Sequence, residues 1–196
     1  MTEYSGIRGT RVKYLSSDPT LNTSTEGQVW YNSTEGTLKS LVQIKAWSAG
    51  GNMGTARYGL GGTGTQTAAL GAGGYSGTYK NETEEYNGTS WTAGGNLTIA
   101  KSYSMGSGTQ TAALSSGGAT PTYPYSPVTD VQGYDGTAWS TRPSLATSRG
   151  KGGGSGTQTA GLTFGGTTDN GSTFTAATEE FTGEIISANI KTLTTG

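Results

Sequence analysis

The chain has 196 residues, a formal net charge of −1 from 12 basic and 13 acidic residues, and neither Cys nor His. These values exclude disulfide bonds, thiol chemistry, His-based acid–base catalysis and zinc sites of the usual kind, and the balanced charge gives no electrostatic footprint for nucleic acid or anionic lipid. Only 31% of the residues are apolar and 35 are Gly, yet Tyr and Trp recur at regular intervals, so we expect a thin-cored all-β protein with almost no helix.

The first residues carry no recognisable targeting signal. Residues 1–5 show no basic segment followed by an apolar one, and no run of eighteen apolar residues occurs in the sequence. We therefore expect neither a secretory signal peptide nor a membrane-spanning helix, and synthesis in a cytoplasm.

Residues 1–45 are predicted to form a small attachment module at the N-terminus. Residues 28–31 and 37–41 have the composition of two strands, and residues 32–36 between them predict the turn of a β-hairpin. A short apolar strand at residues 41–44 is expected to lead into Trp47.

A heptapeptide then occurs three times in residues 46–196. Gly-Thr-Gln-Thr-Ala-Ala-Leu begins at residues 64 and 108 and returns, with one Ala replaced by Gly, at residue 156, so the spacings are 44 and 48 residues. Other residues keep the same phase: Trp47, Trp91 and Trp139; the cations Arg57, Lys101 and Arg149; the double glycines 73–74, 117–118 and 165–166; and the aromatics Tyr86, Tyr134 and Phe181. Such a period defines structural repeats that bury their apolar faces only against one another.

The phase predicts units at about residues 47–90, 91–138 and 139–185, with a partial fourth unit at 186–196 in which Ile186 takes the Trp position. Within the second unit we expect four strands, at residues 91–94, 102–106, 109–115 and 128–134. The small Ala112 and Ala113 predict that the third strand lies where neighbouring units converge, and the Trp is expected to cap the wider outer layer.

This pattern resembles the kelch repeat, in which a double glycine, an aromatic residue, a spaced Trp and a downstream cation follow one another in a four-stranded blade of a β-propeller. The motif Gly-Thr-Gln-Thr-Ala-Ala-Leu, together with the motif Tyr-Asn-Gly-Thr-Ser-Trp, is similar to the repeats in kelch-like arrays of bacteriophage structural proteins. Residues 26–34 resemble the short hairpin near the start of phage fibre and appendage proteins. Kelch blades usually carry a bulkier apolar strand before the glycines than this chain does.

Three blades raise the question of closure, because propellers generally have four to eight blades and open sheets leave strand edges unpaired. Closure can come from strand exchange between subunits, for example two chains giving six blades, or from a fourth blade built from residues 28–46 and 186–196. The alternative architecture is a β-prism of three sheets around a threefold axis. We favour propeller-like blades and expect a homo-oligomer with either architecture.

Three sequence patterns could in principle bind a ligand or catalyse a reaction, but each is better explained as a structural feature. The glycine-rich run 150–156 lacks the Gly-Lys-Ser/Thr ending and the helix of a phosphate-binding loop, and Asp169 lies in a turn without the ligand spacing of a calcium loop. The carboxylate pairs 84–85 and 179–180 recur at matching repeat positions, where we expect them to meet Arg57, Lys101 or Arg149 across the sheet rather than to act as a glycosidase pair.

The loops after the double glycines differ between units and carry the candidate ligand-binding residues, which are Tyr75, Tyr79, Tyr123, Tyr125 and Phe174. Such aromatics stack on sugars or pack against a neighbouring blade or subunit.

The phage resemblance implies a non-enzymatic structural protein of a virion, namely an appendage, fibre or capsid decoration subunit made in the host cytoplasm. The alternative is a lectin-like module that binds a carbohydrate or receptor on the host surface. We expect no catalytic residue, cofactor, metal, nucleic-acid partner or membrane insertion, and we expect other virion proteins and further copies of the chain as partners.

Overall fold

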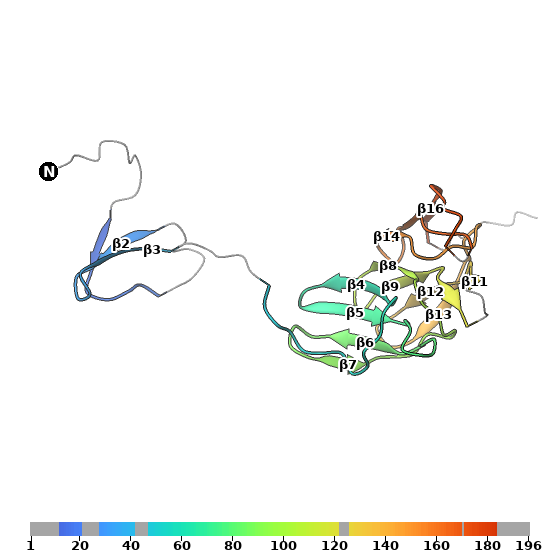
Figure 1. The fold of residues 1–196 in the computed structure, drawn as a ribbon, viewed down its shortest axis with the longest axis horizontal. Helices are drawn as coiled ribbons and strands as arrows, with labels where there is room; N and C mark the ends of the chain where they lie inside the picture. Colours follow the sequence, from blue (N-terminus) through green and yellow to red (C-terminus); the bar gives the residue numbers. More distant parts are fainter. Residues whose placement is uncertain (1–11, 21–27, 42–46, 122–125, 170, 184–196) are drawn as a thin grey trace, which may run out of the picture. The chain divides into compact units, whose positions relative to one another are not determined.

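The computed structural model describes residues 12–20, 28–41, 47–121, 126–169 and 171–183. Throughout these residues the regular elements are β-strands and no helix occurs, which confirms the expected all-β class. The contacts divide the chain into two compact units, residues 1–49 and residues 50–196 (Figure 1).

The N-terminal unit contains β1 (Lys13–Leu15), β2 (Val29–Asn32) and β3 (Thr37–Ser40). Strands β2 and β3 form the expected antiparallel hairpin, and Gly36 in its turn has a φ of 68°. Strand β1, which the sequence pattern did not predict, pairs with β2 in parallel. Most of the strand expected at residues 41–44 lies outside the described residues.

Asp18 organises the polar side of the N-terminal unit. Its Oδ1 accepts hydrogen bonds from Trp30 Nε1 at 2.9 Å and Asn32 Nδ2 at 2.8 Å, and its Oδ2 accepts one from Lys39 Nζ at 2.6 Å. These bonds, first that from Lys39, lower the pKa of Asp18 to about 2. The carboxylate therefore links strands β2 and β3 to the segment that follows β1.

The C-terminal unit contains three antiparallel sheets in series (Figure 1). The first sheet consists of β4 (Gly61–Thr65), β5 (Ala68–Ala72), β6 (Thr83–Tyr86) and β7 (Trp91–Ala93). The second consists of β8 (Met105–Gly108), β9 (Ala113–Ser116), β12 (Val131–Tyr134) and β13 (Trp139–Arg142), and β10 (Ala119–Thr120) with β11 (Ser126–Pro127) forms a small hairpin beside it. The third consists of β14 (Gly153–Gly156), β15 (Gly161–Phe164) and β16 (Thr178–Phe181). Within the described residues, none of these sheets closes into a barrel.

The tryptophan strand belongs to a different sheet from the one predicted. Trp91 pairs with Tyr86, so its strand closes the first sheet instead of opening the second, and Trp139 pairs with Tyr134 in the same way. The cause is the turn between the paired residues, where Gly88 has a φ of 92° and permits a tight hairpin. The sheets are therefore shifted by one strand from the units predicted at residues 47–90, 91–138 and 139–185.

Trp47 differs from the other two repeat tryptophans. Its side chain is fully exposed and its residue lies in no strand, whereas Trp139 is only 6% exposed. Because a repeat tryptophan lies on the sheet of the preceding repeat, Trp47 would need a sheet formed before the first heptapeptide.

The sheets converge at their glycine-rich first strands, β4, β8 and β14, which contact one another in that order. A Cβ atom added at Gly106 would lie 2.3 Å from the carbonyl oxygen of Gly62, and one at Gly154 would lie 2.5 Å from that of Gly106. The convergence therefore involves backbone against backbone. The expectation that the strand predicted to contain Ala112 and Ala113 lies at this convergence was wrong, because Ala113 begins β9, the second strand of its sheet, and Ala112 lies before it.

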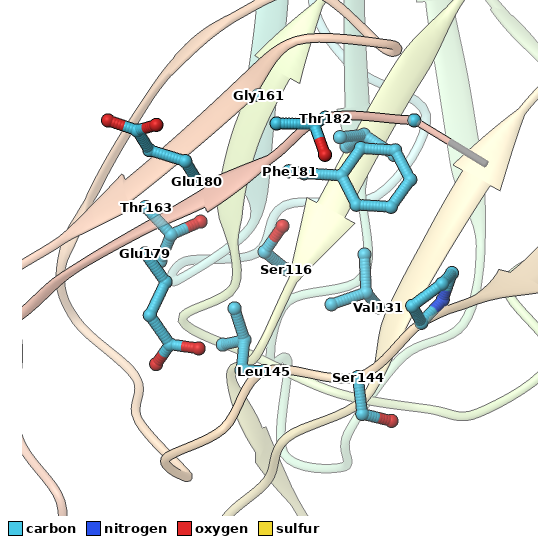
Figure 2. A pocket seen from close by; sticks show the side chains of 13 residues that line it. Ser116, Val131, Ser144, Leu145, Gly161, Thr163, Glu179, Glu180, Phe181 and Thr182 are labelled. Carbon is cyan, nitrogen blue, oxygen red and sulfur yellow. The ribbon is translucent and has the colours of Figure 1, made fainter. Parts of the chain in front are cut away.

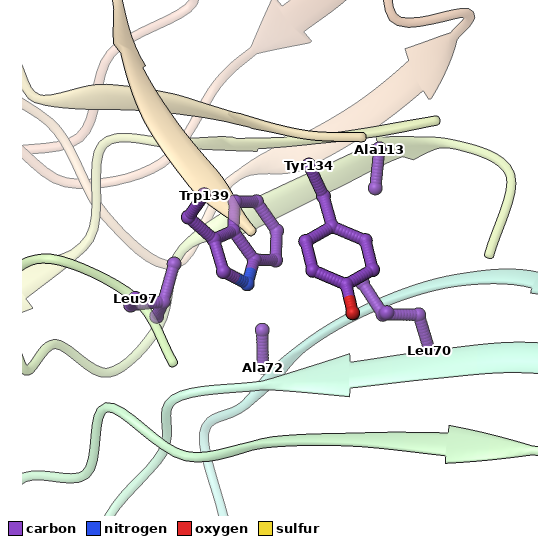
Figure 3. Packing of buried hydrophobic residues seen from close by; sticks show 6 residues of the cluster. All are labelled: Leu70, Ala72, Leu97, Ala113, Tyr134 and Trp139. Atoms are coloured by element: carbon purple, nitrogen blue, oxygen red, sulfur yellow. The ribbon is translucent and has the colours of Figure 1, made fainter. Parts of the chain in front are cut away.

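We call the side of a sheet that meets the preceding sheet its front face, and the opposite side its back face. A buried apolar cluster lies where the back face of the first sheet meets the front face of the second (Figure 3). It comprises Leu70, Ala72 and Leu97 on one side and Ala113, Tyr134 and Trp139 on the other. Polar contacts of its aromatic side chains also cross this junction: Trp139 Nε1 donates to Thr83 Oγ1 at 2.9 Å, and the Tyr134 hydroxyl donates to Glu85 Oε1.

Candidate functional site

The aromatic residues predicted to bind ligand lie in different settings. Tyr75 and Tyr79 pack edge to face with ring centroids 5.3 Å apart, and Phe174 in the third unit is 79% exposed. Tyr123 and Tyr125 lie outside the described residues. The structure therefore joins two of the five predicted residues and places Phe174 in a separate loop.

Two tyrosines that the sequence analysis did not select extend this group into a row of rings. Tyr58 lies 5.6 Å from Tyr75 and 6.2 Å from Tyr103, measured between ring centroids. Lys151 Nζ lies 5.1 Å from the centroid of the Tyr103 ring, within the range of a cation–π contact. We call Tyr58, Tyr75, Tyr79 and Tyr103 the tyrosine row.

Backbone strain marks the end of the tyrosine row. Tyr103 and Lys151 have φ values of 57° and 61°, and both occupy the repeat position of Gly59, whose φ is 65°. Residues other than glycine rarely adopt this left-handed backbone conformation, and those that do cluster at functional sites. The repeat position needs a left-handed residue, and two of the three units fill it with a large side chain.

A cavity of about 590 Å³ lies between the second and third sheets (Figure 2). Its apolar lining comes from Leu114 and Val131 of the second sheet, Leu145 of the following loop and Phe181 of the third sheet. Glu179 and Glu180 lie at its side (Figure 2).

The cavity occupies the place that Trp139 fills at the preceding junction. Phe181 corresponds to Tyr134 by its register, because Gly161 pairs with Phe181 as Ala113 pairs with Tyr134. The residue that corresponds to Trp139 is Ile186, which falls in the partial fourth unit predicted at 186–196 and lies outside the described residues. The cavity therefore lies where the described part of the third sheet has no fourth strand. This position in the repeat explains the cavity without a small-molecule ligand.

The three repeat cations are buried structural groups. The side chains of Arg57, Lys101 and Arg149 have no solvent exposure. Lys101 Nζ lies 2.9 Å from Asp130 Oδ2 and also donates to Ser115 O at 3.0 Å. Burial lowers the pKa of Lys101, and the negative charge of Asp130 opposes that shift.

The prediction that the carboxylate pairs meet these cations holds for the first residue of each pair, because Glu85 instead accepts a hydrogen bond from Tyr134 and Glu180 is exposed. Arg57 faces Glu84 at 3.0 Å without an aligned hydrogen bond, and Arg149 Nη2 donates to Glu179 Oε1 at 2.6 Å. In the second unit Gln132 replaces the glutamate, and it donates to Asp130 Oδ2, the carboxylate that pairs with Lys101.

A backbone amide completes the environment of the side chain at this position in every unit. Gly54 N donates to Glu84 Oε2 at 2.7 Å, Thr98 N donates to Gln132 Oε1 at 2.9 Å, and Ala146 N donates to Glu179 Oε2 at 2.6 Å. These oxygens tie the loop that enters each sheet to its third strand, and so they stabilise the fold.

The glutamine of the heptapeptide is a functional residue of the junction that sequence reasoning missed. Gln110 Nε2 donates to Ala69 O at 3.0 Å and to Tyr86 O at 2.7 Å, both in the preceding sheet. Gln158 makes the same pair of bonds to Ala113 O and Tyr134 O. Its presence in all three heptapeptides was the signal that could have revealed this role.

The turn at Asp169 is closed by its own hydrogen bonds. Oδ1 accepts from the amides of Gly171, Ser172 and Thr173, and Oδ2 accepts from the hydroxyls of Ser172 and Thr173. These bonds, first that from the Thr173 hydroxyl, lower the pKa of Asp169. Among the described residues, no group of three or more acidic side chains could hold a metal ion.

The described part of the chain has no helix that is long and apolar enough to cross a membrane. No protein-family model matches the chain. No curated protein matches it either.

Proposed function

We propose that this chain is a non-enzymatic structural protein of a bacteriophage particle, an appendage, fibre or capsid decoration subunit made in the host cytoplasm. The observation that carries the proposal is that each unit contains one buried cation, which forms an ion pair within that unit. Arg57, Lys101 and Arg149 each pair with a carboxylate inside a unit, and removing one partner of such a buried pair costs about 3–5 kcal/mol. The repeated ionisable groups thus serve the scaffold, which is what a displayed structural subunit requires.

We further propose that the three sheets are kelch-like blades of a propeller-type array. The buried cluster lies between the faces of neighbouring sheets, and the first strands β4, β8 and β14 lie next to one another. Blades around an axis pack in this way. A β-prism would instead gather one core between all three sheets, so the face-to-face cluster favours blades.

The structural role is tested on particles of the phage that encodes the chain. Quantitative mass spectrometry of purified particles should find the chain at a fixed number of copies per particle, and antibodies against it should label one particle substructure in electron micrographs. The other proteins of that substructure are its expected partners. Absence of the chain from purified particles contradicts the proposal.

The tyrosine row supports a second function, the binding of a host-surface glycan. Aromatic faces and a nearby cation suit sugar rings and their acidic substituents, and Tyr58 is 58% exposed. On a glycan array we expect wild-type binding that Tyr103→Ala abolishes and that Phe174→Ala, a matched loss of an exposed aromatic elsewhere, leaves unchanged. Absence of wild-type binding to every glycan, or equal losses in both variants, contradicts this function.

A further inference from the structure

The two ends of the series of sheets carry complementary halves of one junction. The front face of the first sheet presents Tyr86 and Trp91, whose rings lie 5.1 Å apart, much as Tyr134 and Trp139 lie 5.0 Å apart on the second sheet. Tyr134 is fully buried by the preceding sheet, whereas Tyr86 and Trp91 are only half-buried. The first sheet therefore has the aromatic pair of a junction without the sheet that should cover it.

The polar partners of that aromatic pair are present on the back face of the third sheet. By strand register, Thr178 corresponds to Thr83, which accepts from Trp139, and Glu180 corresponds to Glu85, which accepts from Tyr134. Thr178 and Glu180 are both exposed in the chain.

At the junction between the second and third sheets, the front face has no Tyr hydroxyl, and the acceptors equivalent to Thr178 and Glu180 are absent from the second sheet. There the front face carries Phe181, which has no hydroxyl, and the opposing position on the second sheet is Gly133, which has no carboxylate. The residue that corresponds to Thr178 is Val131, which cannot accept a hydrogen bond from an indole. The return of Thr178 and Glu180 at the far end therefore matches the Trp91 and Tyr86 of the first sheet.

The glutamine contact has the same unmatched halves. Gln66 is exposed and makes no side-chain hydrogen bond among the described residues, although Gln110 and Gln158 each make two. The two carbonyl oxygens that correspond to its acceptors belong to Gly161 and Phe181 of the third sheet.

Gly62 supplies a fourth and independent indication. Its repeat equivalents Gly106 and Gly154 must be glycine, because a Cβ atom would collide with the backbone of the preceding sheet at 2.3 Å and 2.5 Å. A Cβ atom at Gly62 would meet only Leu70 O, at 3.8 Å, so the chain itself imposes no such requirement. A neighbouring backbone at this position, that of Gly154 in another molecule, would impose it.

We propose that the front face of the first sheet docks on the back face of the third sheet of a second copy of this chain. In this contact Gln66 of one copy donates to the carbonyl oxygens of Gly161 and Phe181 of the other. The Tyr86 hydroxyl donates to Glu180, and the Trp91 indole donates to Thr178. The interface joins two different surfaces, so it repeats until the rotation closes a ring, of which the smallest has two chains and six sheets.

The first experiment measures the mass of the full chain by light scattering during size-exclusion chromatography. The wild type is expected at twice the chain mass or a higher multiple, and Gly62→Ala is expected as a folded monomer that still unfolds in one cooperative transition. Thr89→Ala, on an exposed turn of the first sheet, is the matched control and should assemble like the wild type. A monomeric wild type, or a Gly62→Ala variant that assembles like the control, overturns the proposal.

The second experiment identifies the two faces and uses the natural absence of cysteine. Two variants, Tyr86→Cys and Glu180→Cys, are mixed under oxidising conditions and separated without reductant. Cross-linked dimers of the mixture should exceed those of either variant alone by about tenfold or more. Equal yields in the three samples overturn the assignment of the faces. The inference rests on the structural role only in that both need a stable array; absence from particles would refute that role while leaving the measured contact intact.

Discussion

Substituting Gly106 tests how closely the sheets approach one another. In Gly106→Ala the new Cβ atom would lie 2.3 Å from Gly62 O, and backbone cannot move aside as a flexible side chain does. The two sheets must separate by about 1 Å at their first strands to restore ordinary van der Waals contact, and overpacking of this kind costs about 3 kcal/mol. For a unit of this size the melting temperature should fall by on the order of 10 °C.

The comparison with Gly62→Ala makes this prediction specific. Both glycines lie in first strands, yet the added methyl group at Gly62 meets only Leu70 O at 3.8 Å, so that variant should gain about 0.5 kcal/mol from the reduced freedom of the unfolded chain. Urea denaturation is measured in a Gln66→Ala background, which removes the proposed contact between copies. Equal stabilities of the two alanine variants would refute the backbone-to-backbone packing of the sheets.

Three further outcomes test individual contacts. Gln110→Ala should lower the free energy of unfolding by about 2 kcal/mol in urea denaturation, because two carbonyl oxygens of the first sheet lose their donor; a change below about 0.5 kcal/mol would contradict this role. Hydrogen bonds hold the pKa of Asp18 at about 2, below its usual value of 3.8. The stabilisation that these bonds give is therefore complete above pH 3.8 and is lost as the pH falls through about 2. The indole NH resonance of Trp30 in proton NMR should shift with a midpoint near pH 2, and a midpoint near 3.8 would argue against the bonds. Burial, followed by the hydrogen bond to Glu85, raises the pKa of Tyr134 to about 12. The stability that the neutral hydroxyl contributes is therefore present below about pH 10 and is lost as the pH rises toward 12. Tyr134→Phe should reduce the loss of stability between pH 7 and 11, and an unchanged pH profile would count against a buried hydroxyl.

The sequence was sufficient for the all-β class, the N-terminal hairpin and the period of the repeats, because each depends on local composition and spacing. The period alone did not assign the tryptophan strand, since a repeat has the same period wherever its boundary is drawn, although the Asn87–Gly88 turn is a hairpin signal that links Trp91 to the strand before it. The pairing of Tyr86 with Trp91 shows that the strand closes the preceding sheet. The two faces of each strand were equally hidden, because thin glycine-rich strands lack the alternation of apolar and polar residues that marks a core.

The candidate sites divide in the same way. Tyr75 and Tyr79 were found because they lie close together in one variable loop. Tyr58 precedes the heptapeptide of that unit and Tyr103 belongs to the next unit, so these two join the row only in the folded chain. The role of the repeated glutamine depends on carbonyl groups of a neighbouring sheet, which no sequence pattern displays.

The junction between sheets also has a consequence for how such a chain can change in length. Every contact across it lies between immediate neighbours, so duplicating or deleting one whole unit recreates the glycine and glutamine contacts of a junction at the new boundary. An insertion of part of a unit would instead put a tryptophan strand out of phase with its sheet. Addition or loss of one whole unit is therefore a step that keeps every sheet in phase with its neighbours, so the number of units can vary without a change in the fold of each sheet.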